Sequence, residues 1–247
     1  MIHTERSDVA MNDLEKMMRY ANDMSNLGVI APHKVKYIDR YNIDWLTELI
    51  KSNKPLKYVC FWHEGNEYPN HVFSQWYEGK HFAINGRTYF TAEQYMMSEK
   101  ALLFNDFYHY TLILQEKSPK TCKELGRAVQ GFDSDLWDAS LREIVFHGNL
   151  GKFQADIGLV YELLKTENAV LIEASPYDGI YGAGISENKL LNEDGSLKVL
   201  PQNWINPKNG TQAQNHLGFV LMGIRDLFRE LMHHTWYPGE EEKTIDF

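Results

Sequence analysis

The chain has 247 residues, of which 43% are hydrophobic and 13% aromatic, and it carries a formal net charge of −9. This composition is sufficient for one sizeable core with a modest extension, so we expect one main domain. The negative charge argues against a protein that binds nucleic acid by charge alone, because such affinity comes largely from Lys and Arg neutralising phosphates. It is compatible with a local basic pocket.

Targeting signals and cysteines bear on the expected location of the protein. The first residues lack the apolar core of a signal peptide, and no window approaches 18 uninterrupted apolar residues, so we expect a protein that is neither secreted nor membrane-spanning. Cys60 and Cys122 form no Cys-x-x-Cys pair, which disfavours disulfides and a zinc knuckle. A reducing cytoplasm is the expected compartment.

The N-terminal part of the chain is predicted to be a helical extension. Apolar positions favour helices over 12–27 and 39–53, separated by Pro32. Asn53-Lys54-Pro55 then reads as a boundary. We therefore divide the chain into an extension over 1–54, a main domain over 55–235 and an acidic tail over 236–247.

Two strands are expected before the central helix. Leu56–Trp62 has the composition of a largely buried strand, and His81–Ile84 is a second one that the Asn85-Gly86 turn ends. The link over 63–79 is a long loop rich in Gly, Asn, Pro and aromatic residues. Loops of this length in compact domains are often functional.

The next helix carries the most informative pair of residues. Thr91 is a good N-cap and Gln94 can complete a capping box, which predicts a helix from Ala92 to about Phe104. Glu93 and Lys100 are separated by nearly two turns, so they share a face about 10 Å apart along the axis. An acid and an amine that project into one pocket would suit a reaction centre. The alternative is a surface helix with scattered charges.

The remaining elements complete a helix-rich α+β fold around a small sheet. A short apolar strand over 169–172 delivers a loop over 173–184, at the strand end where ligands commonly bind. A closing helix follows over 217–231, where apolar residues recur at i, i+3, i+4 and i+7. Between the central helix and this strand, amphipathic patterns and capping residues predict helices over 106–117, 119–129, 133–146 and 152–165.

The loop over 173–184, Glu-Ala-Ser-Pro-Tyr-Asp-Gly-Ile-Tyr-Gly-Ala-Gly, has the composition of a binding loop. Its glycines allow close backbone approach, so a phosphate or ribose could lie against amides while Glu173 and Asp178 accept hydrogen bonds from hydroxyls. The loop lacks Walker and Gly-x-Gly-x-x-Gly spacing. The alternative is a tight structural crossover.

Taken in order, these motifs closely resemble the NADAR (YbiA-like) family of N-glycosidases over roughly Leu56 to Leu231. The motifs that carry the resemblance are Thr-Ala-Glu-Gln-Tyr-Met-Met at 91–97 with the following lysine, Gly-Arg at 126–127, Trp137, Gly-Asn at 148–149, Glu-Ala-Ser-Pro-x-Asp at 173–178 and Asn-His-Leu-Gly at 215–218. The resemblance implies a NADAR/YbiA-like fold. It also implies cleavage of the bond between ribose C1 and a nitrogenous group, in substrates built on ADP-ribose or ribose 5-phosphate.

Such a bond breaks through an oxocarbenium-like state, which gives the candidate catalytic residues their roles. Glu93 is expected to act as general acid/base and electrostatic stabiliser. Lys100 would be a Schiff-base nucleophile if it is partly desolvated, or a charged phosphate contact otherwise. Asp178 would orient ribose hydroxyls or activate water.

The expected substrate-binding residues supply aromatic faces, charges and backbone amides. For the aromatic residues the alternative is a place in the core, for Arg142 and Lys152 ordinary surface charge, and for Asn149 a helix cap. Many relatives have tryptophan before Gly182, whereas this chain has Tyr181, which weakens the carry-over of one particular substrate. The full set is Trp62, Trp76, Arg142, Asn149, Lys152, Glu173, Ser175, Tyr181, Gly182 and Gly184.

Three functions stay open under the resemblance. The enzyme could act on phosphoribosyl aminopyrimidine intermediates of riboflavin synthesis, or it could remove ADP-ribose from guanine in nucleic acid as the antitoxin to an ADP-ribosyltransferase toxin, its genetic partner. The third is an ADP-ribose-binding module without turnover, against which the presence of both Glu93 and Lys100 argues. No histidine spacing is typical of a metal site, so we expect neither metal nor cofactor.

Overall fold

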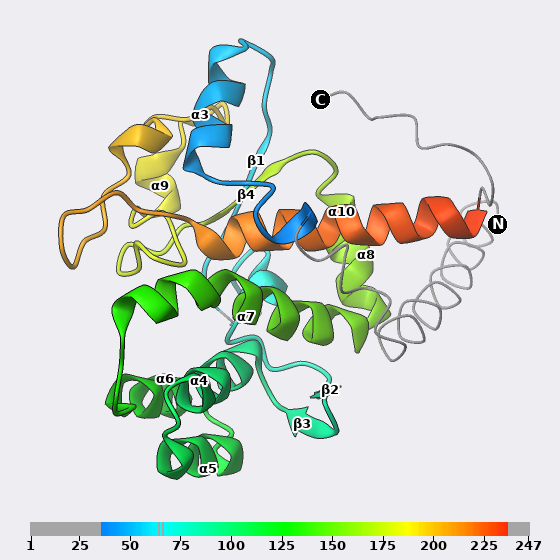
Figure 1. Ribbon diagram of the computed structural model, residues 1–247. Helices are drawn as coiled ribbons and strands as arrows, with labels where there is room; N and C mark the ends of the chain where they lie inside the picture. The colour runs from blue at the N-terminus through cyan, green and yellow to red at the C-terminus, as the bar shows by residue number, and fades with distance from the viewer. Residues whose placement is uncertain (1–35, 64, 66, 237–247) are drawn as a thin grey trace.

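The computed structural model describes residues 36–63, 65 and 67–236, with the backbone alone over 232–236 (Figure 1). The helix expected over 12–27 and the acidic tail from residue 237 lie outside the described residues. The described part is rich in helix and holds only short strands, which confirms the expected fold class. Its helices are α3 (Ile43–Lys51), α4 (Ala92–Leu103), α5 (Phe107–Gln115), α6 (Pro119–Ala128), α7 (Ser134–Gln154), α8 (Ile157–Lys165), α9 (Glu187–Leu190) and α10 (His216–Trp236).

Two strand pairs form the sheets of the described residues. β1 (Tyr58–Phe61) pairs in parallel with β4 (Val170–Glu173), and β2 (Phe82–Ile84) pairs antiparallel with β3 (Arg87–Tyr89). Phe61 lies opposite Glu173 in the parallel pair. Because both strands end at the same edge, the segments that follow them emerge side by side.

The long helix α10 crosses the middle of the molecule, with α7 beneath it in the view of Figure 1. Helices α4, α5 and α6 gather at one end, and α3 lies at the other. α10 packs on β4 and α7, while α4 packs on α5, α6 and α7. The core therefore runs from β4 through α10 and α7 to α4, and it includes the fully buried side chains of Leu171, Phe219 and Phe153.

The described part of the predicted extension packs onto this core. Tyr37, Tyr41 and Leu46 are buried in the same apolar cluster as α10, and the hydroxyl of Tyr41 donates a hydrogen bond to Asp226. α3 also contacts the 3-10 turn η2 (Pro201–Asn203). Residues before 55 thus contribute to the hydrophobic core, while the boundary at 54 stays a prediction.

The prediction that one helix ends at Phe146 and another begins at Lys152 is wrong. α7 continues through Gly148-Asn149 to Gln154, and α8 begins only after Asp156, whose side chain accepts a hydrogen bond from the N–H of Gly158. Gly148 does not break the helix. It provides space for Tyr95 of α4, because a Cβ there would lie 2.5 Å from the tyrosine ring.

Three further features concern the cysteines, the long loop and membrane spans. Cys60 and Cys122 are free and buried. The loop over 63–79 contains a short 3-10 turn, η1 (His71–Phe73). Among the residues that the structure describes, no helix is both long and apolar enough to cross a membrane.

Candidate active site

The start of α4 is held firmly. The N–H of Gln94 donates to Thr91 Oγ1 at 3.1 Å, as the expected cap requires. The side chain of Gln94 reaches back to the N–H of Phe90, one residue before the predicted partner, and its Nε2 donates to carbonyls at the end of α5, including that of Glu116. Gln94 thus fixes the first turn of α4, and with it the direction of Glu93.

Glu93 is 1% exposed and points into the protein. Its backbone N–H donates to the carbonyl of Gln75, and the neighbouring Trp76 side chain acts on its carboxylate and lowers its pKa. Oε1 is buried and has no hydrogen-bond partner among the described residues. Burial raises the pKa of Glu93 to about 7, with a smaller contribution from Asp178 in the same direction. A carboxyl group that titrates near neutral pH is suited to general acid/base chemistry.

The loop after β4 brings two more carboxyl groups to this place. Asp178 is 8% exposed, and its Oδ1 accepts hydrogen bonds from the N–H groups of Ile180 and Tyr181, both at 3.0 Å. Glu173 ends β4, and its Oε2 is buried without a hydrogen-bond partner in the described part of the chain. Burial, and then the charge of Asp178, raise the pKa of Glu173 to about 8.

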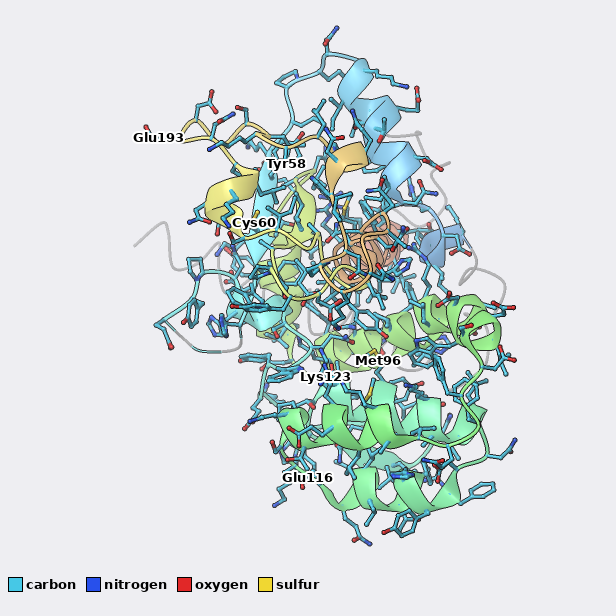
Figure 2. All side chains as sticks on the ribbon, turned by 90° about the vertical axis from the view of Figure 1, so that its left-hand side faces the viewer. Tyr58, Cys60, Met96, Glu116, Lys123 and Glu193 are labelled. Carbon is cyan, nitrogen blue, oxygen red and sulfur yellow. The ribbon has the colours of Figure 1, made fainter. Side chains whose placement is uncertain are left out.

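Lys123 of α6 lies among these carboxyl groups. Its Nζ is 3.5 Å from Asp178 Oδ2 and 5.7 Å from the centre of the Trp76 ring. Burial alone would lower the pKa of Lys123, but the charges of Glu93, Asp178 and Glu173 outweigh burial and raise it. Figure 2 shows Lys123 where the α4–α6 end of the molecule meets the half that carries β1. The site therefore forms where helices and sheet meet.

Aromatic side chains and glycines complete the surroundings. Burial raises the pKa of Tyr181 well above its ordinary value, and the neighbouring Trp137 side chain acts on its hydroxyl in the opposite direction. Gly182 and Gly184 serve the packing of the loop. A Cβ on Gly182 would lie 2.6 Å from the carbonyl oxygen of Glu173. Gly184 has a φ of +69°, and a Cβ there would clash with the carbonyl oxygen of Ile205.

The amine of Lys100 contacts α6 and nearby aromatic rings, not the carboxyl groups around Glu93. Its Nζ donates to the carbonyl of Gly126 at 2.9 Å and lies 4.5 Å from the Phe132 ring centre and 5.5 Å from that of Trp137. Burial, and then the nearby charge of Arg127, lower the pKa of Lys100. Lys100 therefore borders the site through Trp137, while Lys123 is the lysine that the structure brings directly to the carboxyl groups.

Arg142 is directed toward the segment before α3. Its guanidinium donates to the carbonyls of Ile38 and Tyr41 and pairs with Asp39. It also lies 3.0 Å from Nδ1 of His216. Burial and the charge of Arg142 lower the pKa of His216 to about 4, so the neutral ring accepts this hydrogen bond.

Lys152 and Asn149 support the segment that contacts Glu93. Lys152 is 2% exposed, and its Nζ donates to the carbonyl of Ser74 at 2.7 Å. Burial lowers the pKa of Lys152 to about 7. Asn149 is fully buried inside α7 and donates to Val145 and to Gln75 Oε1, so it does not cap a helix.

The two remaining candidates lie at the ends of the paired strands. Trp62 follows β1 and its ring centre lies 5.9 Å from that of Tyr177. Ser175 is 4% exposed, and its Oγ accepts a hydrogen bond from the N–H of Tyr177. Ser175 thus shapes the loop over 173–184, while Trp62 borders it.

Sequence reasoning did not single out Lys123 or Trp137 as site residues. The signal for Lys123 was present, because Lys120, Lys123 and Arg127 repeat at helical spacing on the helix that Ser118-Pro119 begins. Trp137 could not be distinguished from a core residue by its pattern. Among the described residues, no group of three or more His, Cys, Asp or Glu side chains could hold a metal ion.

Comparison with known proteins decides the family. A model of the NADAR domain matches residues 60–229, which is more than half of the chain. The chain belongs to the NADAR family. The NMR structure of the Escherichia coli protein YbiA shares the fold of this NADAR protein, with a TM-score of 0.52 at 18% identity, and the match covers 77% of this chain and 94% of that one.

Two of three similar proteins are named for the same enzyme activity. N-glycosidase R617 of Acanthamoeba polyphaga mimivirus is 37% identical over 180 residues, which cover 69% of this chain and 95% of that protein. N-glycosidase Npun_R5314 of Nostoc punctiforme is 28% identical over 145 residues, 59% and 78% of the two chains. Protein irg-1 of Caenorhabditis elegans is 31% identical over 156 residues, 62% and 66% of the two. The enzyme class of this NADAR protein is N-glycosidase.

Proposed function

We propose that this N-glycosidase hydrolyses the bond between ribose C1 and a base or amine in ADP-ribose or ribose-phosphate conjugates. The observation that carries the proposal is the meeting of Glu93, Glu173 and Asp178 around Lys123 in a largely buried site. Trp76 and Tyr181 line the same place. Carboxyl groups, a cation and aromatic rings are what a charged sugar attached to a flat base requires.

The chemistry follows from where charge develops. As the C1–N bond breaks, positive charge grows on C1 and the ring oxygen, and a nearby carboxylate stabilises it. Glu93, with a pKa of about 7, can give a proton to the departing nitrogen and then accept one from the water that adds to C1. Water thereby supplies hydroxyl to C1 and hydrogen to the nitrogen. Asp178, fixed by two backbone N–H groups, would orient the ribose hydroxyls.

The two lysines suit different roles. The raised pKa of Lys123 keeps this amine charged, so it would balance the carboxylates and contact substrate oxygens. The lowered pKa of Lys100 favours the neutral amine that a Schiff-base nucleophile needs. Lys100 is therefore our candidate for a covalent route, an alternative to direct water addition: its amine would displace the base or amine from C1 of the ring-opened sugar, and water would then hydrolyse the imine. Lys123 takes the electrostatic role.

A cationic face on α6 supports a phosphorylated substrate. Lys120, Lys123 and Arg127 recur at i, i+3 and i+7, and the charges of Lys123 and Arg127 both act on Glu93. Phosphate oxygens bound on this face would lie next to the carboxyl groups. The Arg142 guanidinium and the Lys152 amine both donate to backbone carbonyls. These two residues would position the protein segments around the site.

A product assay by mass spectrometry tests the proposal. It uses the full chain and three substrates side by side, in a reducing buffer that matches the cytoplasm expected for this protein. The substrates are an ADP-ribosylated guanine oligonucleotide, a free ADP-ribose conjugate and a phosphoribosyl aminopyrimidine. Release of guanine-bearing DNA would favour the antitoxin role opposite an ADP-ribosyltransferase, and release of the pyrimidine would favour riboflavin intermediates. Binding of ADP-ribose without release from any substrate would leave only a binding module.

A further inference from the structure

Four aromatic rings form a continuous row beside the loop that carries Asp178. We define the aromatic row as Tyr177, Trp62, His63 and Tyr68. Their ring centres lie 5.9 Å apart from Tyr177 to Trp62, 3.9 Å from Trp62 to His63 and 4.5 Å from His63 to Tyr68. The row connects the loop after β4 with the segment after β1, because the parallel strands end at the same edge.

Loop packing does not account for the whole row. Trp62 and His63 are partly buried, but Tyr177 is 71% exposed and Tyr68 is 41% exposed. Rings that served only to hold the loop would gain most from burial, and adjoining exposed rings are more typical of a binding surface.

The position of the row indicates its ligand. Tyr177 immediately precedes Asp178, whose carboxylate pairs with Lys123 on the cationic face of α6. A ligand that reaches the carboxyl groups with its ribose and α6 with its phosphates would therefore bring its next ring to Tyr177. An exposed phenol ring offers stacking for any flat base. The chemistry that fits is a nucleobase joined to the ribose through phosphate.

We propose that the aromatic row, and Tyr177 above all, stacks a nucleobase of the substrate other than the group that is cleaved. This proposal rests on the proposed N-glycosidase function and deepens it. The substrate then carries at least one base beyond the cleaved bond, either the adenine of ADP-ribose or a neighbouring base of a strand. A ribose phosphate without such a base would not contact the row.

Equilibrium binding of three probes tests this inference with the full chain. The probes are ADP-ribose, ribose 5-phosphate and a short single-stranded DNA, measured by calorimetry on the wild type, Tyr177→Ala and Tyr177→Phe. Tyr108→Ala is the matched control, because Tyr108 is 70% exposed on α5. We expect Tyr177→Ala to raise the Kd of ADP-ribose or of the DNA by about tenfold, since stacking on one ring contributes that order of affinity. Tyr177→Phe and Tyr108→Ala should keep wild-type affinity.

The probe that loses affinity identifies the source of the base. Loss for ADP-ribose points to its adenine, loss for the DNA points to a base of a strand, and either result supports the proposal. The Kd of ribose 5-phosphate should not change in Tyr177→Ala. An equal loss for ribose 5-phosphate and ADP-ribose, or no loss for any probe, would overturn the stacking role. Failure of the proposed function is a separate result, seen as intact substrates in the mass-spectrometric assay. Binding to the row is measured without turnover.

Discussion

Lys123 Nζ lies 3.5 Å from Asp178 Oδ2, and this ion pair joins α6 to the loop after β4. The two residues come from the helical end of the molecule and from the sheet, so the site exists only when both halves are folded together. Glu93 and Glu173 act on the same lysine from α4 and β4. Lys123 therefore balances three carboxyl groups that would otherwise repel one another in a site of low polarity.

Replacement of the central carboxyl group should abolish turnover without loss of folding. Glu93→Gln keeps the shape of the side chain but can neither ionise nor exchange a proton, so we expect a fall in kcat of at least about 100-fold. Glu99→Gln, on the same helix, is the control and should stay active. Steady-state kinetics with a melting curve for each variant checks this, and a folded Glu93→Gln enzyme with near-normal kcat would remove Glu93 from the mechanism.

Removal of the central cation should move the pH profile. Lys123 lowers the pKa of both Glu93 and Glu173, so Lys123→Met should raise both pKa values. The limb of the rate profile that depends on an ionised carboxylate should then shift to higher pH, with a lower maximum. Lys120→Met, on the exposed part of the same face, should leave this limb in place. A profile of kcat/KM against pH decides, and an unshifted limb in Lys123→Met would contradict the electrostatic role.

The buried carboxyl groups also predict how stability depends on pH. Glu93 and Glu173 titrate at about 7 and about 8 when folded, against an ordinary value of 4.5. Between these values the folded state binds more protons than the unfolded state, so their contribution to stability falls as pH rises. The free energy of unfolding of the wild type relative to Glu93→Gln should therefore decrease from about pH 4.5 to 7 and then level off. Urea titrations at several pH values measure this difference, and a constant difference would mean that Glu93 is not desolvated.

Local sequence signals predicted most of the secondary structure. Thr91 and Ser118 cap helices as expected, because capping depends on residues a few positions apart. Gly148 and Asn149 were misread as a break, since the sequence does not show that Tyr95 of another helix fills the space beside the glycine. A glycine required for packing and a glycine that ends a helix look alike in one chain.

The candidate site was predicted only in part, because local motifs are visible in the sequence whereas contacts between distant segments are not. Glu93, Glu173 and Asp178 were found because their motifs resemble the family, and the structure brings them together. Lys123 was missed because its partners are distant in sequence and meet it only through the contact of α6 with the β4 loop. Spacing along α4 likewise could not reveal that Lys100 donates to Gly126 of another helix.

Asp178 should contribute to affinity as well as to rate. Asp178→Ala removes a charged acceptor, which typically costs about 1.5–3 kcal/mol of binding to hydroxyl donors. It also frees the N–H groups of Ile180 and Tyr181, so Asp178→Asn is the control that can keep those hydrogen bonds while losing the charge. We expect calorimetry to show weaker ADP-ribose binding for both variants, with the larger loss for alanine. An unchanged Kd and rate in Asp178→Ala would make the loop purely structural.

Borohydride trapping separates covalent from purely electrostatic catalysis. If neutral Lys100 attacks C1 of the ring-opened N-glycoside, the C1–N bond to the base or amine breaks, that group leaves with a proton and an imine to Lys100 forms, which borohydride reduces to a stable amine adduct before water can hydrolyse it. Peptide mapping should then locate the adduct on Lys100, and Lys100→Arg should lose both the adduct and most activity, because a guanidinium stays protonated. Lys123→Arg keeps its charge and is the matched variant, so it should still form the adduct on Lys100. An adduct on Lys123 instead, or a fully active Lys100→Arg enzyme, would remove the nucleophile role from Lys100 and leave it as a contact of Gly126, Phe132 and Trp137 at the border of the site.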